Sequence, residues 1–293
     1  MAPRTQPTER QRRLGTELRK LRLAAGLSGD QAAALIGADR QRVSHIETGR
    51  VDVPRNGLYN LLRSYGCAAG PLFEALMAMA HDRGRGWWDA YRDVMGRPAL
   101  DLAELESRAA HIRNHEPLVI PGVLQTAEYA RSVCETFDEH DAKIDRYVQF
   151  RLDRQRILEQ RSGTPYHAVI QEGALRTRVG SPEIMRRQLR RLIEIARLPH
   201  VTLQVFPFEA GPYSGVSRSF SIFGGPTPAL DTVRLEQAVA SAILRDEDDT
   251  SRYGKIFTRL TELALPRVDP EAKPESHEGR DSLTLIQHLM YAS

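Results

Sequence analysis

The amino-acid sequence predicts a mainly α protein, in which an N-terminal five-helix domain precedes an α+β domain with a small sheet. Three observations lead to this prediction. At 293 residues the chain exceeds the usual size of one domain, so two domains are expected. Helical periodicity dominates the first 80 residues. Segments rich in β-branched and aromatic residues come late and close together, which favours a small sheet over an alternating parallel one.

The N-terminal part reads as a basic arm followed by five helices. Residues 1–13 are polar and predict a flexible arm. Two interpretations stay open for the arginines of this arm: they follow the DNA backbone, or they belong to a solvated tail (Arg4, Arg10, Arg12 and Arg13). The apolar stripe that begins at Leu14 predicts a first helix ending at Gly26. A fourth helix is expected over about 58–65 and a fifth over 71–80, so that the domain spans 14–80.

Two short helices around a tight turn lie between these elements. Ser28 and Gln31 form the pattern of a capping box that opens one helix, which breaks at Gly37. Asp39 is placed to cap the next helix, in which two apolar residues share a face and polar residues occupy the others (Val43 and Ile46; Arg40, Gln41, Ser44 and His45). Such a pair, with long polar donors exposed on the second helix, is suited to reading a major groove.

This stretch resembles the helix-turn-helix of the xenobiotic-response-element family of regulators, relatives of the phage lambda repressor and Cro. The matching residues stand at the family's spacing: Ser28, Ala33, Gly37, Val43, Ser44, Ile46, Glu47 and Gly49. Gly29 departs from the pattern, because the family usually places a glutamine there to touch the DNA backbone. The residues Arg19, Lys20 and Arg22 by themselves favour a solvated face. The resemblance implies instead that one arginine among them pairs with Glu47.

Contacts to DNA can be predicted residue by residue. Base edges are expected to meet Arg40, Gln41, Ser44 and His45, and phosphates to meet Ser28, Arg42, Arg50 and Arg55. Positive charge is concentrated in the part of the chain that is expected to bind DNA. Residues 1–63 hold twelve Lys or Arg and six Asp or Glu, whereas the remaining residues hold 29 Lys or Arg and 32 Asp or Glu. One such domain covers a half-site, so we expect a homodimer on a pseudo-palindromic operator of double-stranded DNA.

A connector rich in glycine and aromatic residues is expected over residues 81–98. It holds Trp87, Trp88 and Tyr91, although a plain linker would be polar. One interpretation is that these rings dock the connector onto the core of the second domain. The other is that they anchor a partner or a ligand.

The second domain is expected over residues 99–266. Helices are predicted at about 100–115, 141–161, 182–197 and 249–263, with a further helix that contains Tyr129 and Arg131. Strands are predicted at 166–171, 201–206, 218–223 and 232–235. Residues 267–280 are charged, contain two prolines and predict a linker. A C-terminal helix over 281–293 has a wide apolar face, which caps its own domain, crosses to a dimer partner or binds another protein.

This part of the chain resembles the antitoxin-like C-terminal domain of actinobacterial helix-turn-helix regulators. The resemblance rests on Gly86 to Trp88, Glu116-Pro117, Pro121-Gly122, Leu124 to Thr126, Tyr129 to Arg131, Arg151, Arg154, Gln155, Val201-Thr202, Gln204-Val205 and Pro207-Phe208. It implies a regulator that receives a signal from a small protein encoded next to it. Two alternatives are an antitoxin-like protein that mainly sequesters its partner and only autoregulates, and a repressor that responds to a small molecule.

Several other classes of function find no support in the sequence. There is no apolar run of membrane-spanning length and no signal-peptide core, so a cytoplasmic, nucleoid-associated protein is expected. Two cysteines are too few for a disulfide framework. His111 and His115 stand four apart in a stretch expected to be helical, but no third zinc ligand accompanies them. Without a phosphate-binding Gly-rich loop or a nucleophile elbow, no enzyme, catalytic residue, metal or cofactor is predicted.

Overall fold

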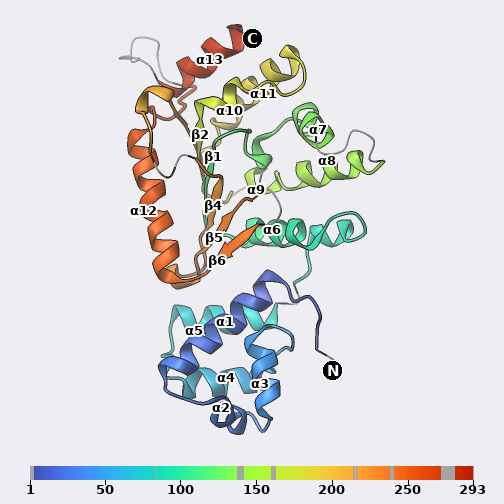
Figure 1. Ribbon diagram of the computed structural model, residues 1–293, viewed down its shortest axis with the longest axis vertical. Helices are drawn as coiled ribbons and strands as arrows, with labels where there is room; N and C mark the ends of the chain where they lie inside the picture. Colours follow the sequence, from blue (N-terminus) through green and yellow to red (C-terminus); the bar gives the residue numbers. More distant parts are fainter. Residues whose placement is uncertain are drawn as a thin grey trace. The chain divides into compact units, whose positions relative to one another are not determined.

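The computed structural model describes residues 3–82, 84–136, 142–159, 163–213, 215, 217–237, 241–271 and 281–292 (Figure 1). It divides into two compact units. Unit 1 comprises residues 1–92, 96–105 and 226–230, and unit 2 comprises residues 93–95, 106–225 and 231–293. Unit 1 is helical and unit 2 combines helices with a six-stranded sheet, which confirms the predicted fold class.

Unit 1 is built from five helices joined by short turns. They are α1 (Glu9–Ala24), α2 (Gly29–Leu35), α3 (Arg40–Glu47), α4 (Arg55–Ser64) and α5 (Pro71–His81), followed by the 3₁₀ helix η1 (Trp87–Tyr91) and the start of α6 (Arg97–Arg108). Ser28 and Gln31 form the expected capping box at α2, and the Asp39 carboxylate accepts a hydrogen bond from the backbone of Arg42 to cap α3. Local capping chemistry therefore sets the first residue of both helices.

The arm predicted over residues 1–13 is shorter in the structure, because α1 already begins at Glu9. Thr8 caps this helix: its side chain accepts from the backbone of Gln11, and the Gln11 side chain accepts from the backbone of Thr8. This second capping box adds a helical turn before the apolar stripe that starts at Leu14.

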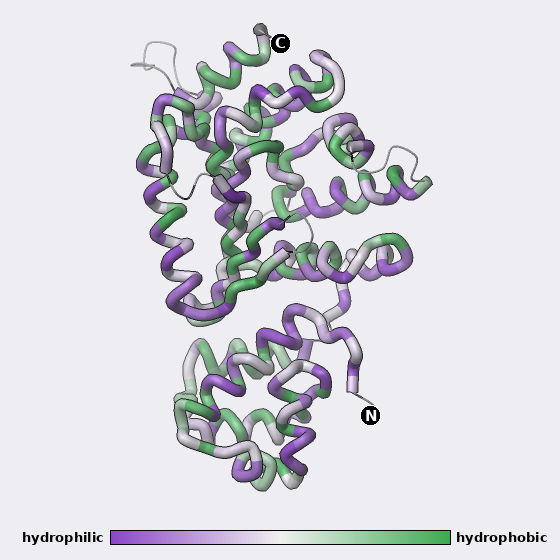
Figure 2. The backbone as a smooth tube through the Cα atoms, viewed as in Figure 1, coloured by the Kyte–Doolittle hydropathy of each residue, from purple (hydrophilic) through white to green (hydrophobic). Residues whose placement is uncertain are grey.

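The core of unit 1 joins all five helices. Leu18 from α1, Leu58 and Leu62 from α4 and Leu76 from α5 are at most 1% exposed, and Ala32 of α2 is fully buried between them. Figure 2 shows hydrophilic and hydrophobic residues interspersed along these helices, as expected for helices that bury one face.

Unit 2 contains a six-stranded sheet and its covering helices. The strands are β1 (Ile112–Glu116), β2 (Tyr166–Gln171), β3 (Val201–Phe206), β4 (Phe220–Phe223), β5 (Thr232–Leu235) and β6 (Ala242–Leu244). The helices are α7 (Ala127–Glu135), α8 (Ile144–Asp153), α9 (Arg156–Glu159), α10 (Glu172–Arg176), α11 (Pro182–Ile195), α12 (Glu247–Leu263) and α13 (Ser282–Ala292), with the 3₁₀ helices η2 (Gly122–Leu124) and η3 (Phe208–Ala210). Among the described residues, none of these helices or those of unit 1 is long and apolar enough to cross a membrane.

The strand order is β3-β2-β1-β4-β5-β6. β1 and β2 are parallel, as are β2 and β3, whereas β4, β5 and β6 continue the sheet in antiparallel fashion. α12 covers one face, where Phe257 and Leu260 pack against Val169, Phe220 and Val233 (Figure 1). The sheet is therefore mixed, with β1 joining its parallel and antiparallel halves.

The C-terminal helix α13 packs on α11 and β3, which is the intramolecular arrangement among those left open by the sequence. Ser282 at its start accepts a hydrogen bond from the backbone of Val205. The backbones of Leu265 and Val268 donate to β3 carbonyls, so the first part of the predicted linker follows the sheet edge. Residues 272–280 of that linker lie outside the described residues.

Two expectations about secondary structure are wrong, and one strand has no counterpart among the predicted elements. The helix predicted over about 100–115 ends at Arg108, and residues 112–116 form β1 instead. The helix predicted over 141–161 is divided into α8 and α9. β6 was not predicted. The strand β1 has the polar sequence IRNHE, which carries no strand signal of its own; its conformation follows from pairing with β2 and β4 on both sides.

Candidate nucleic-acid interface

The helix α3 presents one face to the core of unit 1 and another to solvent. Val43 and Ile46 are 3% and 4% exposed, whereas Arg40, Gln41 and Ser44 are exposed and His45 is partly exposed. Gly37 adopts a positive φ of 61° in the turn before α3, a conformation that favours glycine. The four residues predicted to contact bases are thus all on a short helix, and three of them are exposed.

A buried ion pair fixes α3 against α1. The Arg22 guanidinium contacts both carboxylate oxygens of Glu47, with Nε to Oε1 at 2.5 Å and Nη2 to Oε2 at 3.0 Å. A third donor of Arg22, Nη1, reaches the carbonyl of Leu27 at 2.7 Å, just before α2. This confirms the pairing implied by the resemblance and makes the solvated-face interpretation wrong for Arg22.

The pair also shapes the electrostatics of the core beneath α3. Its hydrogen bond to Glu47 raises the pKa of Arg22. Burial, with a smaller contribution from the Glu47 charge, raises the pKa of the neighbouring Tyr65 to about 12. The first effect favours the charged form of Arg22 and the second favours the neutral form of the Tyr65 phenol.

Gly15 allows α1 and α3 to approach closely, which the sequence analysis missed. A Cβ atom on Gly15 would lie 2.4 Å from the carbonyl oxygen of Glu47 and 2.6 Å from that of Ile46, both of which are backbone atoms that cannot easily move. A glycine within the helical stretch after Leu14 was the available signal, since such a glycine often marks close packing.

Arg40 and the four residues predicted to contact phosphates all lie at the surface. Arg40, Arg42, Arg50, Arg55 and Ser28 are all exposed. The Arg40 side chain is 75% exposed and its Nη1 lies 3.8 Å from the carboxylate of Asp30, a weak surface pair. A shallow pocket of about 430 Å³ lies beside it, lined by residues that include Arg19, Ser28, Gly29, Arg40, Ser44 and Thr48. Three of the predicted contacts, Ser28, Arg40 and Ser44, therefore border one polar pocket.

Gly29, the departure from the family pattern, has a structural consequence for Arg40. A Cβ atom on Gly29 would lie 3.2 Å from Cγ of Arg40, closer than most such contacts. The aliphatic part of the Arg40 side chain therefore occupies space that a larger side chain at position 29 would need.

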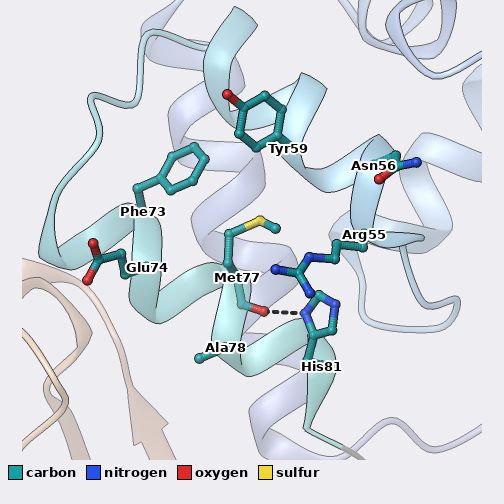
Figure 3. Close-up of a pocket in the computed structure, with 8 residues that line it drawn as sticks. All are labelled: Arg55, Asn56, Tyr59, Phe73, Glu74, Met77, Ala78 and His81. Carbon is teal, nitrogen blue, oxygen red and sulfur yellow. Dashed lines mark hydrogen bonds between the residues drawn. The ribbon is translucent and has the colours of Figure 1, made fainter.

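A second pocket, of about 480 Å³, lies between α4 and α5 (Figure 3). The rings of Tyr59 and Phe73 meet edge to face, with centroids 5.6 Å apart, and His81 Nδ1 bonds the carbonyl of Met77 at 2.7 Å. Arg55 and Asn56 also line it. Its mainly apolar lining suits a hydrophobic side chain better than a phosphate.

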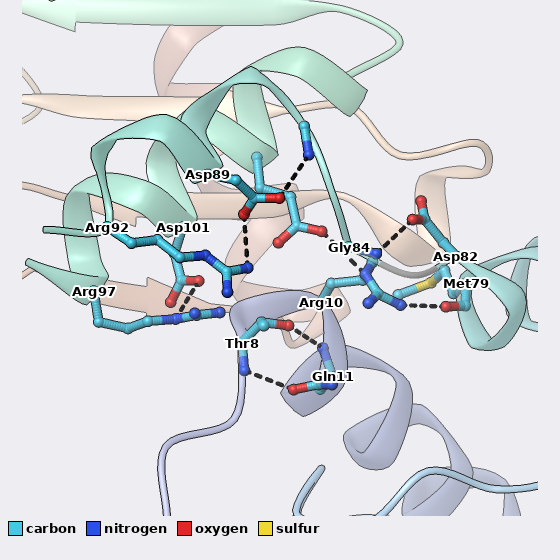
Figure 4. Close-up of polar contacts among 12 residues, drawn as sticks. Thr8, Arg10, Gln11, Met79, Asp82, Gly84, Asp89, Arg92, Arg97 and Asp101 are labelled. Atoms are coloured by element: carbon cyan, nitrogen blue, oxygen red, sulfur yellow. Dashed lines mark hydrogen bonds and ion pairs between the residues drawn. The ribbon is translucent and has the colours of Figure 1, made fainter. Parts of the chain in front are cut away.

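Arginines of the N-terminal segment have partners that the sequence did not predict. Arg10 donates from Nε to Glu104 at 3.0 Å and also bonds the Met79 carbonyl, within the polar cluster of Figure 4. Arg13 pairs with Glu17 at 3.3 Å, and both side chains are largely buried. For Arg10 and Arg13, neither a path along DNA nor a solvated tail describes the structure. Burial is the main cause that raises the pKa of Glu104, with Arg10 acting in the opposite direction.

Comparison with known protein families decides the classification. Residues 13–76 match the model of a helix-turn-helix domain, and residues 99–270 match that of a domain of unknown function, DUF5753. The chain belongs to the DUF5753 family. No curated protein and no solved structure matches it. Its helix-turn-helix makes this DUF5753 protein a DNA-binding transcriptional regulator.

The aromatic residues of the connector lie in η1, within unit 1 of the DUF5753 protein. Trp88 and Tyr91 are each 6% exposed, and Trp87 meets both rings edge to face at centroid distances of 6.0 and 6.1 Å. Burial of two of the three rings leaves Trp87 as the more accessible member. Their role as a partner or ligand anchor stays a prediction.

The two histidines considered for zinc do not share a helix in the DUF5753 protein. His115 lies in β1, is fully buried, and its Nδ1 bonds the carbonyl of Val169 at 2.9 Å. His111 precedes the strand, and burial lowers its pKa. Within the described residues, no group of three His, Cys, Asp or Glu side chains is placed to hold a metal ion.

Proposed function

We propose that this regulator reads a specific operator through α3. Arg40 and Gln41 at the start of α3 meet base edges first, and Ser44 and His45 follow one turn on. Ser28, Arg42, Arg50 and Arg55 contact phosphates on either side. The observation that carries the proposal is that α3 exposes its polar face while Val43 and Ile46 are buried and Glu47 is fixed by Arg22.

The side-chain chemistry predicts which bases are read. Arginine is suited to bidentate contact with O6 and N7 of guanine, and glutamine to N6 and N7 of adenine. Loss of Arg40 or Gln41 should therefore cost about 1–3 kcal/mol of discrimination at one base pair. Loss of Arg55 should weaken binding to all sequences alike, because phosphates carry no base identity.

We further propose that the protein acts at the nucleoid as a homodimer on a pseudo-palindrome. An eight-residue α3 contacts a few base pairs, which is one half-site. Two copies related by a two-fold axis would place their reading helices about 34–36 Å apart, one turn of DNA.

Unit 2 is proposed to receive the signal, from a small protein encoded beside the regulator. The support is the resemblance carried by residues between 116 and 208, which lie in unit 2, and a core separate from that of unit 1. An antitoxin-like role, in which sequestering the partner is the main task, differs in its prediction: the partner would then be bound at fixed stoichiometry irrespective of DNA. Purification from the native host, with mass spectrometry of co-eluting protein, separates the two by comparing DNA-bound and DNA-free fractions.

The central experiment is selection of operators from a randomised DNA library with the full-length protein, followed by binding measurements at several salt concentrations. Arg40→Ala should flatten base preference at one position of each half-site. Arg55→Ala should keep the preference and make the slope of log affinity against log salt shallower by about 1. Arg63→Ala is the matched control, because it removes the same charge from the opposite end of α4, about 12 Å away along the helix.

The outcome that contradicts this proposal is specific. If Arg40→Ala, shown to be folded, binds the selected operator with unchanged affinity and base preference, α3 does not read sequence as described. If Arg63→Ala changes the salt slope as much as Arg55→Ala, the phosphate assignment of Arg55 is wrong. Analytical ultracentrifugation of the complex tests the dimer through a ratio of two chains per operator.

A further inference from the structure

The pocket of about 430 Å³ beside Arg40 contains an arginine that has no role so far. Its lining comes from the second half of α1, the start of α2 and one side of α3. Three arginines contribute to it, Arg19, Arg22 and Arg40. Arg22 forms the brace to Glu47 and Arg40 is proposed to read a base, so the role of Arg19 is left to explain.

The charges of this pocket leave one cation in excess. Its lining holds three arginines and two carboxylates, those of Asp30 and Glu47. Glu47 is engaged by Arg22, and Asp30 lies 3.8 Å from Arg40. Arg19 is exposed, and among the described residues it makes no hydrogen bond or ion pair. The unbalanced positive charge of the pocket is therefore that of Arg19.

The backbone of α1 holds Arg19 at a fixed place beside α3. Gly15, Arg19 and Arg22 follow one another at spacings of four and three residues, so they share one face of α1. Gly15 lets this face approach the backbone of α3 closely, and Arg22 ties it to Glu47 through two hydrogen bonds. Arg19 therefore extends from the part of α1 that is fixed against the reading helix.

Hydroxyl groups of the lining add donors to this charge. The Ser28 oxygen accepts from the backbone of Gln31 at 3.2 Å, which leaves its O–H available as a donor. The Thr48 hydroxyl is already used, because it donates to the carbonyl of Ser44 at 2.8 Å. Guanidinium and serine hydroxyl donors are the groups with which proteins hold the phosphates of DNA.

We propose that Arg19 and the Ser28 hydroxyl bind one phosphate of the DNA backbone, beside the base pairs that Arg40 and Ser44 contact. A phosphodiester carries a single negative charge, which matches the one arginine in excess, and its oxygens accept from charged donors. This phosphate sets the position of α3 on the duplex, because Arg40 and Ser44 line the same pocket. The inference rests on the proposed reading of DNA through α3 and adds a contact from α1.

The first test measures affinity and its salt dependence with the full-length protein and the selected operator. Arg19→Gln should weaken binding about tenfold, the effect of losing one hydrogen bond to a charged group. It should also make the slope of log affinity against log salt shallower by about 1. Arg19→Lys should keep the slope, because lysine binds phosphate as a point charge. Lys20→Gln is the matched control, since it removes a positive charge from the next residue of α1, outside the pocket lining.

The same comparison on a duplex of unrelated sequence separates this inference from the proposed base contacts. A phosphate carries no base identity, so Arg19→Gln should weaken this binding by a similar factor. If Arg40→Ala left the base preference unchanged, the proposed reading of bases would fail. The contact of Arg19 would still be decided, because its test does not depend on sequence preference.

A second test identifies the phosphate. Each phosphate of one operator half-site is replaced in turn by an uncharged methylphosphonate. At one position the replacement should weaken binding by the wild type about tenfold. At that position it should not weaken binding by Arg19→Gln further, because the variant has already lost the contact. Inorganic pyrophosphate, titrated in calorimetry at millimolar concentration without DNA, should show no saturable binding.

Four results would overturn the proposal. These are an unchanged affinity and salt slope for Arg19→Gln, an equal change for Lys20→Gln, and additive losses for Arg19→Gln at every methylphosphonate. The fourth is saturable binding of pyrophosphate that Arg19→Gln abolishes, which would assign the pocket to a free phosphorylated molecule. The unfolding midpoint of Arg19→Gln should equal that of the wild type, because the residue is exposed, and this verifies its fold.

Discussion

Removal of the Glu47 carboxylate is the most informative test of how α3 is held. The Arg22 and Glu47 side chains are only 11% and 9% exposed, and two donors of one face two oxygens of the other. Glu47→Ala leaves the guanidinium with the Leu27 carbonyl alone. The structure thus predicts a buried charge without compensation, next to the exposed face that is proposed to read DNA.

The size of the effect follows from this burial. Breaking a buried pair by removing one partner costs about 3–5 kcal/mol. For a unit of this size, each kcal/mol lowers the unfolding midpoint by about 4–8 °C, so a loss of roughly 12 °C or more is expected. Asp30→Ala is the control, because its pair with Arg40 is exposed at 3.8 Å and should contribute no more than about 1 kcal/mol.

The assay can be confined to unit 1 within the full chain. Both tryptophans of the sequence, Trp87 and Trp88, lie in unit 1, so tryptophan fluorescence follows its unfolding in denaturant. Operator affinity is measured in parallel at a temperature where the variant is folded. If Glu47→Ala loses no more stability than Asp30→Ala, the Arg22–Glu47 pair is not the brace described above, and α3 must be held by its apolar contacts alone.

Three further predictions concern packing, pH and base preference. Gly15→Ala should destabilise unit 1 by about 1–3 kcal/mol, because the new Cβ would lie 2.4 Å from a backbone oxygen. Gly57→Ala in α4 should instead stabilise unit 1 by about 0.5–1 kcal/mol, because its Cβ would lie no closer than 3.5 Å to any side-chain atom. Denaturant titration followed by tryptophan fluorescence compares the two variants. Burial raises the pKa of Glu116 from 4.5 to about 7, so between these pH values the folded chain keeps Glu116 protonated while the unfolded chain has lost the proton. The contribution of Glu116 to the free energy of unfolding is therefore present at low pH and is lost as the pH rises to about 7. The stability of the wild type relative to Glu116→Gln should therefore fall by about 3 kcal/mol between pH 4 and pH 8 in calorimetry, and a flat difference would contradict the burial argument. Gly29→Ala should alter the base preference at the Arg40 position in operator selection while leaving the unfolding midpoint within a few degrees, because the new Cβ displaces only the Arg40 stem; unchanged preference would show that Arg40 adapts freely.

The part of the candidate site that could be predicted is the part that depends on neighbours in sequence. Ser28 with Gln31, and Asp39 with the backbone of Arg42, are contacts across three residues, so the caps could be read from the chain. The burial of Val43 and Ile46 follows from helical periodicity. The choice of Arg22 as the partner of Glu47 could not be made in this way, since the two are 25 positions apart and Arg19 and Lys20 are equally basic.

The sequence by itself determined the helix-turn-helix, its caps, its apolar stripe and most of the strands of unit 2, because these depend on propensity and periodicity within a few residues. Tertiary structure alone decided that Arg10 meets Glu104, 94 positions away, and that the polar segment containing Asn114 and Glu116 is a buried central strand. The physical reason is that both depend on burial against distant elements. A buried arginine needs an acidic partner, whereas an exposed one is solvated by water. A polar segment becomes a strand when its backbone forms hydrogen bonds with a neighbouring strand on each side.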